Sequence, residues 1–201
     1  MFDRRNVTAV LLAAALAAGC SEGTTEPPAT TEPLSAAESV ALFEATRAIH
    51  NDTAATIIGG SENSVVIACP MGGQVTLTQT VVDESVADTA RLTTTSTASP
   101  SGCQLSSGGT RFTVDGRPSV RERIVTSLTG LFEFTLEGSV TGALDWQSDG
   151  RSGSCAIDLV LSEAPDSSGT GSPVAAVLAG TLCGHETRLE LEGVVDPDPS
   201  G

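Results

Sequence analysis

Beyond about residue 57, hydrophobic and polar residues alternate with a period of two along most of the chain. Such alternation is typical of β-strands with one buried face. Clusters of Gly, Pro, Asp and Ser separate the alternating stretches, as expected for turns. The pattern predicts ten strands, at residues 65–69, 74–82, 87–97, 110–115, 119–126, 131–137, 139–147, 154–162, 174–183 and 187–192. Their short spacing and many Thr and Val residues favour antiparallel pairing.

One helix is expected before these strands. Ser35 can cap its N-terminus with Glu38 three residues later, an arrangement in which each side chain accepts a backbone N–H of the other. The expected buried stripe consists of Leu42, Ala45 and Ile49, with Ala41 and Ala48 beside it. Phe43 falls outside this stripe, whereas Glu44 and Arg47 lie on the opposite side. The helix is expected to end near residues 50–52.

Three hairpin registers follow from placing apolar residues opposite one another on a shared face. The expected opposed pairs are Leu136–Val140, Phe134–Gly142 and Phe132–Leu144 in one hairpin, Trp146–Cys155, Leu144–Ile157 and Gly142–Leu159 around the turn 149–152, and Ile124–Phe132 with Arg123–Glu133 in the third. The opposite face then carries the mostly polar set Glu133, Thr135, Ala143, Asp145 and Asp158. The predicted fold is therefore mainly β, an antiparallel sandwich or curled open barrel with one N-terminal helix.

The first 20 residues have the layout of a secretory signal. Arg4 and Arg5 precede the uncharged apolar run 7–18, which is too short to span a bilayer permanently. The junction Leu16-Ala17-Ala18-Gly19-Cys20 resembles the lipobox of bacterial lipoproteins, although Ala17 stands where leucine is usual. This resemblance implies cleavage of residues 1–19 and attachment of a diacylglyceryl group to Cys20. An ordinary signal peptide cleaved nearby is the alternative.

The residues after Cys20 divide the mature chain into a tether, a domain and a tail. Residues 20–34 comprise the lipidated cysteine and a flexible segment rich in Thr, Pro and Glu, which cannot bury enough surface to fold. Residues 35–192 are expected to form a single β-rich domain and residues 193–201 a disordered tail. Ser21 directly after Cys20 implies, within the lipoprotein family, a lipid-anchored location in the bacterial cell envelope at the outer membrane.

Four further cysteines remain once Cys20 serves as the anchor, an even number that suits an oxidising compartment. They are Cys69, Cys103, Cys155 and Cys183. Of their three possible pairings we favour Cys69 with Cys103 and Cys155 with Cys183, which close loops of about 30 residues. Zinc binding is the rival interpretation, but only Cys183 and His185 have a close Cys–His spacing.

Composition excludes several classes of function. The chain of 201 residues has a net charge of −15, no Lys and no Tyr, which argues against nucleic-acid binding and against general attraction to anionic membranes. Neither a G-x-S-x-G motif nor a glycine-rich phosphate loop is present. A hydrolytic site would have to combine His50 or His185 with Asp145, Asp149 or Asp158. We assign no catalytic residues, no metal ligands and no cofactor.

Arginines concentrate in one part of this acidic chain. Arg111, Arg117, Arg121 and Arg123 lie within 13 positions. The alternation places Arg111, Arg121 and Arg123 on the outer face, where they could form a docking patch for an anionic partner. The simpler interpretation is a solvated strand face, in which Arg123 pairs across the strands with Glu133.

The function that these features favour is a non-enzymatic binding or structural module, anchored to the membrane through lipid, with an unknown protein or small-molecule partner. A small secreted hydrolase with a site assembled from loops is one alternative. A carrier of an apolar ligand is another, and it would require an apolar interior cavity of a few hundred Å³.

Overall fold

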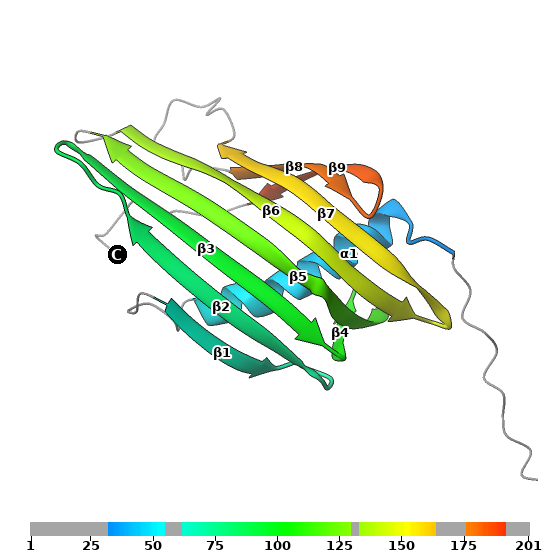
Figure 1. Ribbon diagram of the computed structural model, residues 1–201. Helices are drawn as coiled ribbons and strands as arrows, with labels where there is room; N and C mark the ends of the chain where they lie inside the picture. The colour runs from blue at the N-terminus through cyan, green and yellow to red at the C-terminus, as the bar shows by residue number, and fades with distance from the viewer. Residues whose placement is uncertain (1–31, 55–61, 130–132, 164–175, 192–201) are drawn as a thin grey trace, which may run out of the picture.

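The computed structural model describes residues 32–54, 62–129, 133–163 and 176–191 (Figure 1). Its elements are one helix and nine strands: α1 (Ala36–Ala54), β1 (Glu62–Ala68), β2 (Gln74–Asp83), β3 (Thr89–Ser101), β4 (Cys103–Ser107), β5 (Thr110–Thr129), β6 (Glu133–Ser148), β7 (Arg151–Glu163), β8 (Ala176–Leu182) and β9 (His185–Leu191).

The nine strands form one antiparallel sheet in the order β1-β2-β3-β5-β6-β7-β8-β9, with β4 paired to β5 beside this path. The sheet curls but does not close, because β1 and β9 lie at its two ends rather than pairing with each other. The predicted fold class is thus confirmed in its second form, a curled open sheet with one N-terminal helix. Figure 1 shows α1 lying across one face of this sheet.

The core lies between α1 and the face of the sheet that α1 covers, which we call the inner face. Fully buried side chains from both layers meet there, including Leu42 of α1 with Leu77, Phe112, Val114, Leu144 and Leu159 of the sheet. The opposite, outer face carries the alternate residues of the same strands. The predicted one-sided burial is therefore confirmed: Leu144 is buried, whereas its neighbour Asp145 is exposed.

The helix is rotated relative to the predicted stripe. Phe43 is buried, contrary to expectation, and Ser39 and Leu42 are buried beside it, because residues three and four apart share a helix face. Arg47 was expected to point away from the core, but its Nη2 atom lies 3.6 Å from Oε1 of Glu122 on β5. The helix thus contacts the sheet through a stripe that carries one ion pair.

The predicted N-terminal cap of α1 is confirmed and extended by a residue distant in sequence. The Ser35 N–H donates to Oε2 of Glu38 at 2.8 Å, and the Glu38 N–H donates to the Ser35 hydroxyl at 3.3 Å. Arg151 at the start of β7 donates to the other oxygen of Glu38 and forms an ion pair with it. The capping carboxylate therefore also joins the helix to the β6–β7 hairpin.

We predict that this carboxylate makes the stability of the domain depend on pH. The hydrogen bond from Arg151 and those from Ser35 lower the pKa of Glu38 from 4.5 to about 2. The stabilisation is thus fully present above pH 4.5 and is lost as the pH falls toward about 2. The Glu38→Gln variant should have an unfolding free energy about 1 kcal/mol lower than the wild type at pH 7, as other capping changes do. Its unfolding free energy should also fall less than that of the wild type when the pH is lowered.

Urea unfolding at pH 7, 5 and 3 measures this difference. Glu44→Gln is the matched control, because Glu44 is an exposed carboxylate of the same helix that makes no ion pair with a described residue. Parallel curves of stability against pH for the wild type and Glu38→Gln would contradict the assignment.

Two pairs of predicted strands are continuous in the structure. The stretches 110–115 and 119–126 are both parts of β5, which runs through an irregularity between Gly116 and Val120 that contains a cis Arg117–Pro118 bond. The stretches 131–137 and 139–147 are both parts of β6, with Gly138 in mid-strand. The strand breaks that the alternation predicted between residues 115 and 119, at the Asp115-Gly116 turn, and at Gly138 are therefore wrong.

All three predicted hairpin registers differ from those in the structure, two of them because β6 is continuous. Residues 134–140 belong to one strand, so Leu136 faces Thr126 rather than Val140, and Ile124 faces Gly138 rather than Phe132. The β6–β7 hairpin turns through two residues, not four, because Ser148 pairs with Arg151. Its register shifts by two positions: Leu144 faces Cys155, Trp146 faces Gly153 and Gly142 faces Ile157. A shift of two keeps every side chain on its predicted face.

Both favoured disulfides are present. Cys69–Cys103 joins the end of β1 to β4, and Cys155–Cys183 joins β7 to the turn between β8 and β9. The first bond therefore links the β1 end of the sheet to β4, which pairs with β5, and the second links the β8–β9 hairpin to β7. Cys20 lies outside the described residues, as do the rest of the expected tether up to residue 31 and the expected tail at 193–201. The last residues of the expected tether, 32–34, are described, and Leu34 is buried among the core residues.

Candidate functional site

The outer face of the central strands is dominated by small hydroxyl side chains. Outward positions on the two strands before β5 and on the one after it carry Thr76, Thr78 and Thr80 of β2, Thr93, Thr95, Thr97 and Ser99 of β3, and Ser139 and Thr141 of β6. β-branched threonines pack well on a pleated surface, which accounts for their use in strands. This face offers many hydrogen-bonding groups, and the exposed carboxylates of Glu137 and Asp158 lie on it as well.

Arg121 and Arg123 lie in the middle of this hydroxyl-rich surface, on β5. Arg121 stands between Thr97 and Thr141 on the two adjacent strands, and Arg123 stands between Thr95 and Ser139. Residues opposed in an antiparallel sheet share a face, so two guanidinium side chains are flanked by four hydroxyls. The two arginines are separated by one residue on the same strand, and their Cα atoms are therefore about 7 Å apart. We call these six residues the arginine surface.

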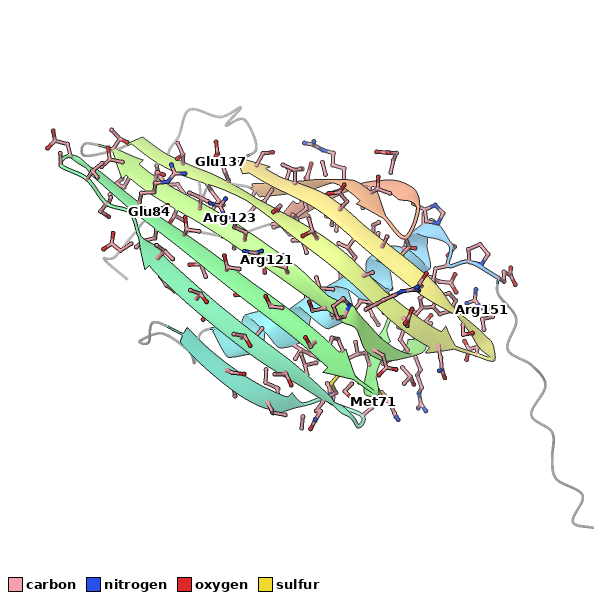
Figure 2. The ribbon with its side chains drawn as sticks, viewed as in Figure 1. Met71, Glu84, Arg121, Arg123, Glu137 and Arg151 are labelled. Atoms are coloured by element: carbon pink, nitrogen blue, oxygen red, sulfur yellow. A yellow bond between two sulfur atoms is a disulfide. The ribbon has the colours of Figure 1, made fainter. Side chains whose placement is uncertain are left out.

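The expected partner of Arg123 is not opposite it. Glu133 faces Thr129 at the far end of β5, and Ser139 occupies the position predicted for Glu133. Among the described residues, neither Arg121 nor Arg123 forms an ion pair or hydrogen bond, and both are exposed. Figure 2 shows both side chains on the outer face, with Glu84 and Glu137 labelled toward one end of the sheet. The cross-strand pair that made the simpler interpretation attractive is therefore absent.

Arg111 does not belong to this group. It lies near the opposite end of β5, before the irregularity at Gly116, and pairs with Ser106 of β4. Counted along β6, Arg111 is about eight residues from Arg121, which corresponds to about 26 Å. The predicted three-arginine patch thus divides into the arginine surface and a separate cation, while Arg117 pairs with Asp145 at 3.3 Å.

The other residues singled out in the sequence do not converge on a catalytic site. Nε2 of His185 lies 2.9 Å from the Leu34 carbonyl oxygen, which ties the start of β9 to the segment before α1. His50 lies in α1, and its side chain is outside the described set. Asp145 and Asp158 point from the outer face, and Asp149 occupies the β6–β7 turn. The described residues contain no group of three or more His, Cys, Asp or Glu side chains placed to hold a metal.

A small cavity lies between α1 and the sheet. One apolar cavity, lined by Phe43, Val120, Val140 and Ile157 among others, measures only about 30 Å³. This volume is about that of one water molecule and far below the few hundred Å³ that an apolar carrier would need. Within the part of the chain that the structure covers, no helix is both long and apolar enough to cross a membrane.

The chemistry of the arginine surface suits the binding of anions. Guanidinium groups donate up to five N–H hydrogen bonds, and carboxylates or phosphates accept them in pairs. Sequence reasoning found Arg121 and Arg123 but missed Thr95, Thr97, Ser139 and Thr141. The Thr-rich run at 93–97 was a visible signal, but its use required the β3–β5 and β5–β6 registers.

Comparison of the chain with protein-family models, with curated proteins and with solved structures found no significant match.

Proposed function

We propose that this protein is a lipid-anchored, non-enzymatic binding module of the bacterial envelope, which docks an acidic segment of another envelope protein on the arginine surface. The observation that supports docking is the pair Arg121 and Arg123, exposed and without an ion-pair partner among the described residues of a chain with net charge −15. The lipobox resemblance at Cys20 and the two disulfides support an envelope location.

An acidic protein segment suits this surface better than an anionic bilayer does. Attraction to a membrane contributes about 1 kcal/mol for each basic residue near it, so two arginines add about 2 kcal/mol. The 25 Asp and Glu residues of the chain are repelled by the same membrane. A short acidic segment meets the arginines and the four hydroxyls directly, and hydrogen bonds to charged groups are stronger and more directional than long-range attraction.

Site-specific cross-linking of the full-length chain in a bacterial envelope tests this proposal. A photoreactive amino acid at Thr78, which lies beside Thr97 on the neighbouring strand, should cross-link a partner through a peptide rich in Asp and Glu. Arg121→Glu should lower the yield at least about fivefold, because it replaces attraction by repulsion at the surface. Raising salt from about 50 to about 500 mM should also lower the yield. In a separate measurement, the mass of the intact mature protein extracted from the membrane should correspond to a chain that begins at Cys20 and carries diacylglycerol.

Arg188→Glu is the matched control. Arg188 is an exposed residue of β9 that, like Arg121, makes no ion pair with a described residue, and its reversal changes the net charge equally. It should leave the cross-link intact. Equal yields for the wild type and Arg121→Glu, or no cross-linked partner at all, would refute docking. A mature chain that begins elsewhere with unmodified Cys20 would refute the lipid anchor.

A further inference from the structure

A second candidate site lies at one end of the sheet, where three turns distant in sequence meet. Met71 follows β1, Gln104 and Arg111 come from the β4–β5 hairpin, and residues 148–152 form the β6–β7 hairpin. Together they line an open cleft of about 420 Å³, which we call the terminal cleft. This volume falls within the range of small-molecule sites. Figure 2 shows Met71 and Arg151 at this same end of the molecule.

The walls of the terminal cleft are held in place. The Cys69–Cys103 disulfide joins the β1–β2 turn to β4. The Gln104 N–H donates to the Gly72 carbonyl at 2.8 Å, and the Met71 N–H donates to the Gln104 carbonyl at 3.3 Å. On the other side, Arg151 donates a hydrogen bond to Glu38 of α1, and its Cζ atom lies 5.9 Å from the centre of the Trp146 ring. A cleft with fixed walls loses little entropy when a ligand binds.

The lining of the terminal cleft offers more hydrogen-bond donors than carboxylates to accept them. Arg111 is exposed and makes no ion pair with a described residue, and Arg151 uses one of its five N–H groups on Glu38. Ser148 is only 5% exposed, and its buried hydroxyl has no hydrogen-bond partner. A buried hydroxyl left unpaired is costly, so its presence in the lining points to a ligand that completes it.

The lining also limits the charge of the ligand. Arg111 and Arg151 contribute two positive charges to the lining and Asp149 one negative charge, but Glu38 already pairs with Arg151. Arg111 is therefore the cation of the lining that has no carboxylate partner among the described residues. A ligand carboxylate can pair with Arg111, whereas the second charge of a phosphate dianion would find no unpaired cation and would be repelled by Asp149. Gln104, Thr113, Gln147 and Ser152 add amide and hydroxyl groups that suit the hydroxyls of a ligand.

We propose that the terminal cleft binds a small hydroxylated carboxylate, such as an acidic sugar, with the carboxylate on Arg111. This site lies about 26 Å from the arginine surface and is independent of it. Arg111 supplies the main attraction, because its guanidinium has no competing carboxylate. Asp149 weakens binding by repelling the ligand, and Ser148 gains a partner.

Titration of the full-length chain in non-ionic detergent with glucuronate tests the proposal. Trp146, the only tryptophan of a chain without tyrosine, should report binding by a change in fluorescence, because Arg151 lies against its ring. Arg111→Ala should weaken binding at least about tenfold, and Asp149→Asn should strengthen it. Calorimetry of the same variants checks that the optical change follows binding.

Two control variants and three control ligands make the test specific. Arg188→Ala and Arg121→Glu should leave glucuronate binding unchanged, so failure here is distinct from failure of docking on the arginine surface. Neutral glucose, and acetate without hydroxyls, should bind at least about tenfold more weakly than glucuronate. The proposal is overturned if glucuronate does not bind, if Arg111→Ala binds it normally, or if glucose or glucose 6-phosphate binds as tightly.

Discussion

Replacement of Gly142 by alanine is expected to reduce the unfolding free energy by at least about 3 kcal/mol. Gly142 lies in mid-strand on β6 with φ of +139°, a conformation that residues with a side chain rarely adopt. A Cβ atom there would lie 2.3 Å from the Ser119 carbonyl oxygen and 2.9 Å from Cα of Val120. These are backbone atoms, so the clash is relieved only by moving β5 away from β6.

The position of Gly142 explains why a glycine is needed there. It pairs with Val120, the first residue after the irregularity in β5, and on its other side with Ile157 of β7. β5 and β6 are the longest strands, with 20 and 16 residues, and strands of this length must bend to curl around a helix. Glycine kinks and irregular pairing are the usual means of producing such bends.

Gly184→Ala is the control for this prediction. Gly184 also has positive φ, at +87°, but nothing lies within 4 Å of a Cβ built on it. The Gly184→Ala variant should therefore lose only about 1–2 kcal/mol of unfolding free energy, through backbone strain. Urea unfolding of the two variants separates strain from the steric clash, and equal losses would show that β5 and β6 tolerate a side chain at Gly142.

Glycine is also where the sequence interpretation failed most. The run Glu137-Gly138-Ser139 between two alternating stretches looks like a turn, but Gly138 lies in mid-strand opposite Ile124. A Cβ there would meet the Arg123 carbonyl oxygen at 2.4 Å, so this glycine permits close approach of two strands. A single sequence does not distinguish these two uses of glycine, because both interrupt an alternating pattern.

The β6–β7 turn, in contrast, carried a usable signal. Asp149 and Gly150 have φ of +48° and +76°, the conformation that a two-residue hairpin turn requires at both central positions. Asp-Gly is among the preferred dipeptides for this turn, and reading it so would have placed Ser148 opposite Arg151. The buried residues of this hairpin were still predicted correctly, since an error of two positions leaves each side chain on its own face.

The candidate sites were less predictable than the fold because they depend on register and on distant turns. Arg121 and Arg123 stood out as charges, but whether Glu133 or Ser139 faces Arg123 depends on whether Gly138 is a turn. The terminal cleft combines Met71, Arg111 and Arg151, which belong to three separate hairpins. Local patterns determine which face a residue occupies, whereas such clefts require the arrangement of the whole sheet.

Removal of the Cys155–Cys183 disulfide is expected to cost about 3.5 kcal/mol. The two cysteines are 28 residues apart, and the chain-entropy model attributes this much to a loop of that length in the unfolded state. Replacing both by alanine is preferable to serine, because Cys155 is only 1% exposed and a hydroxyl buried there would add its own cost. Because domains unfold with only about 5–15 kcal/mol, such a loss is a large fraction of the total.

The second disulfide gives an internal comparison that tests the cause of this loss. Cys69 and Cys103 are 34 residues apart, so chain entropy alone predicts losses that agree within about 0.2 kcal/mol for the two double alanine variants. Urea unfolding of both variants measures the difference. A much larger loss for Cys155→Ala/Cys183→Ala would instead show that the bond acts in the folded state, by holding the β8–β9 hairpin against β7. That result would contradict the entropic account and place the weakest part of the sheet at its β9 end.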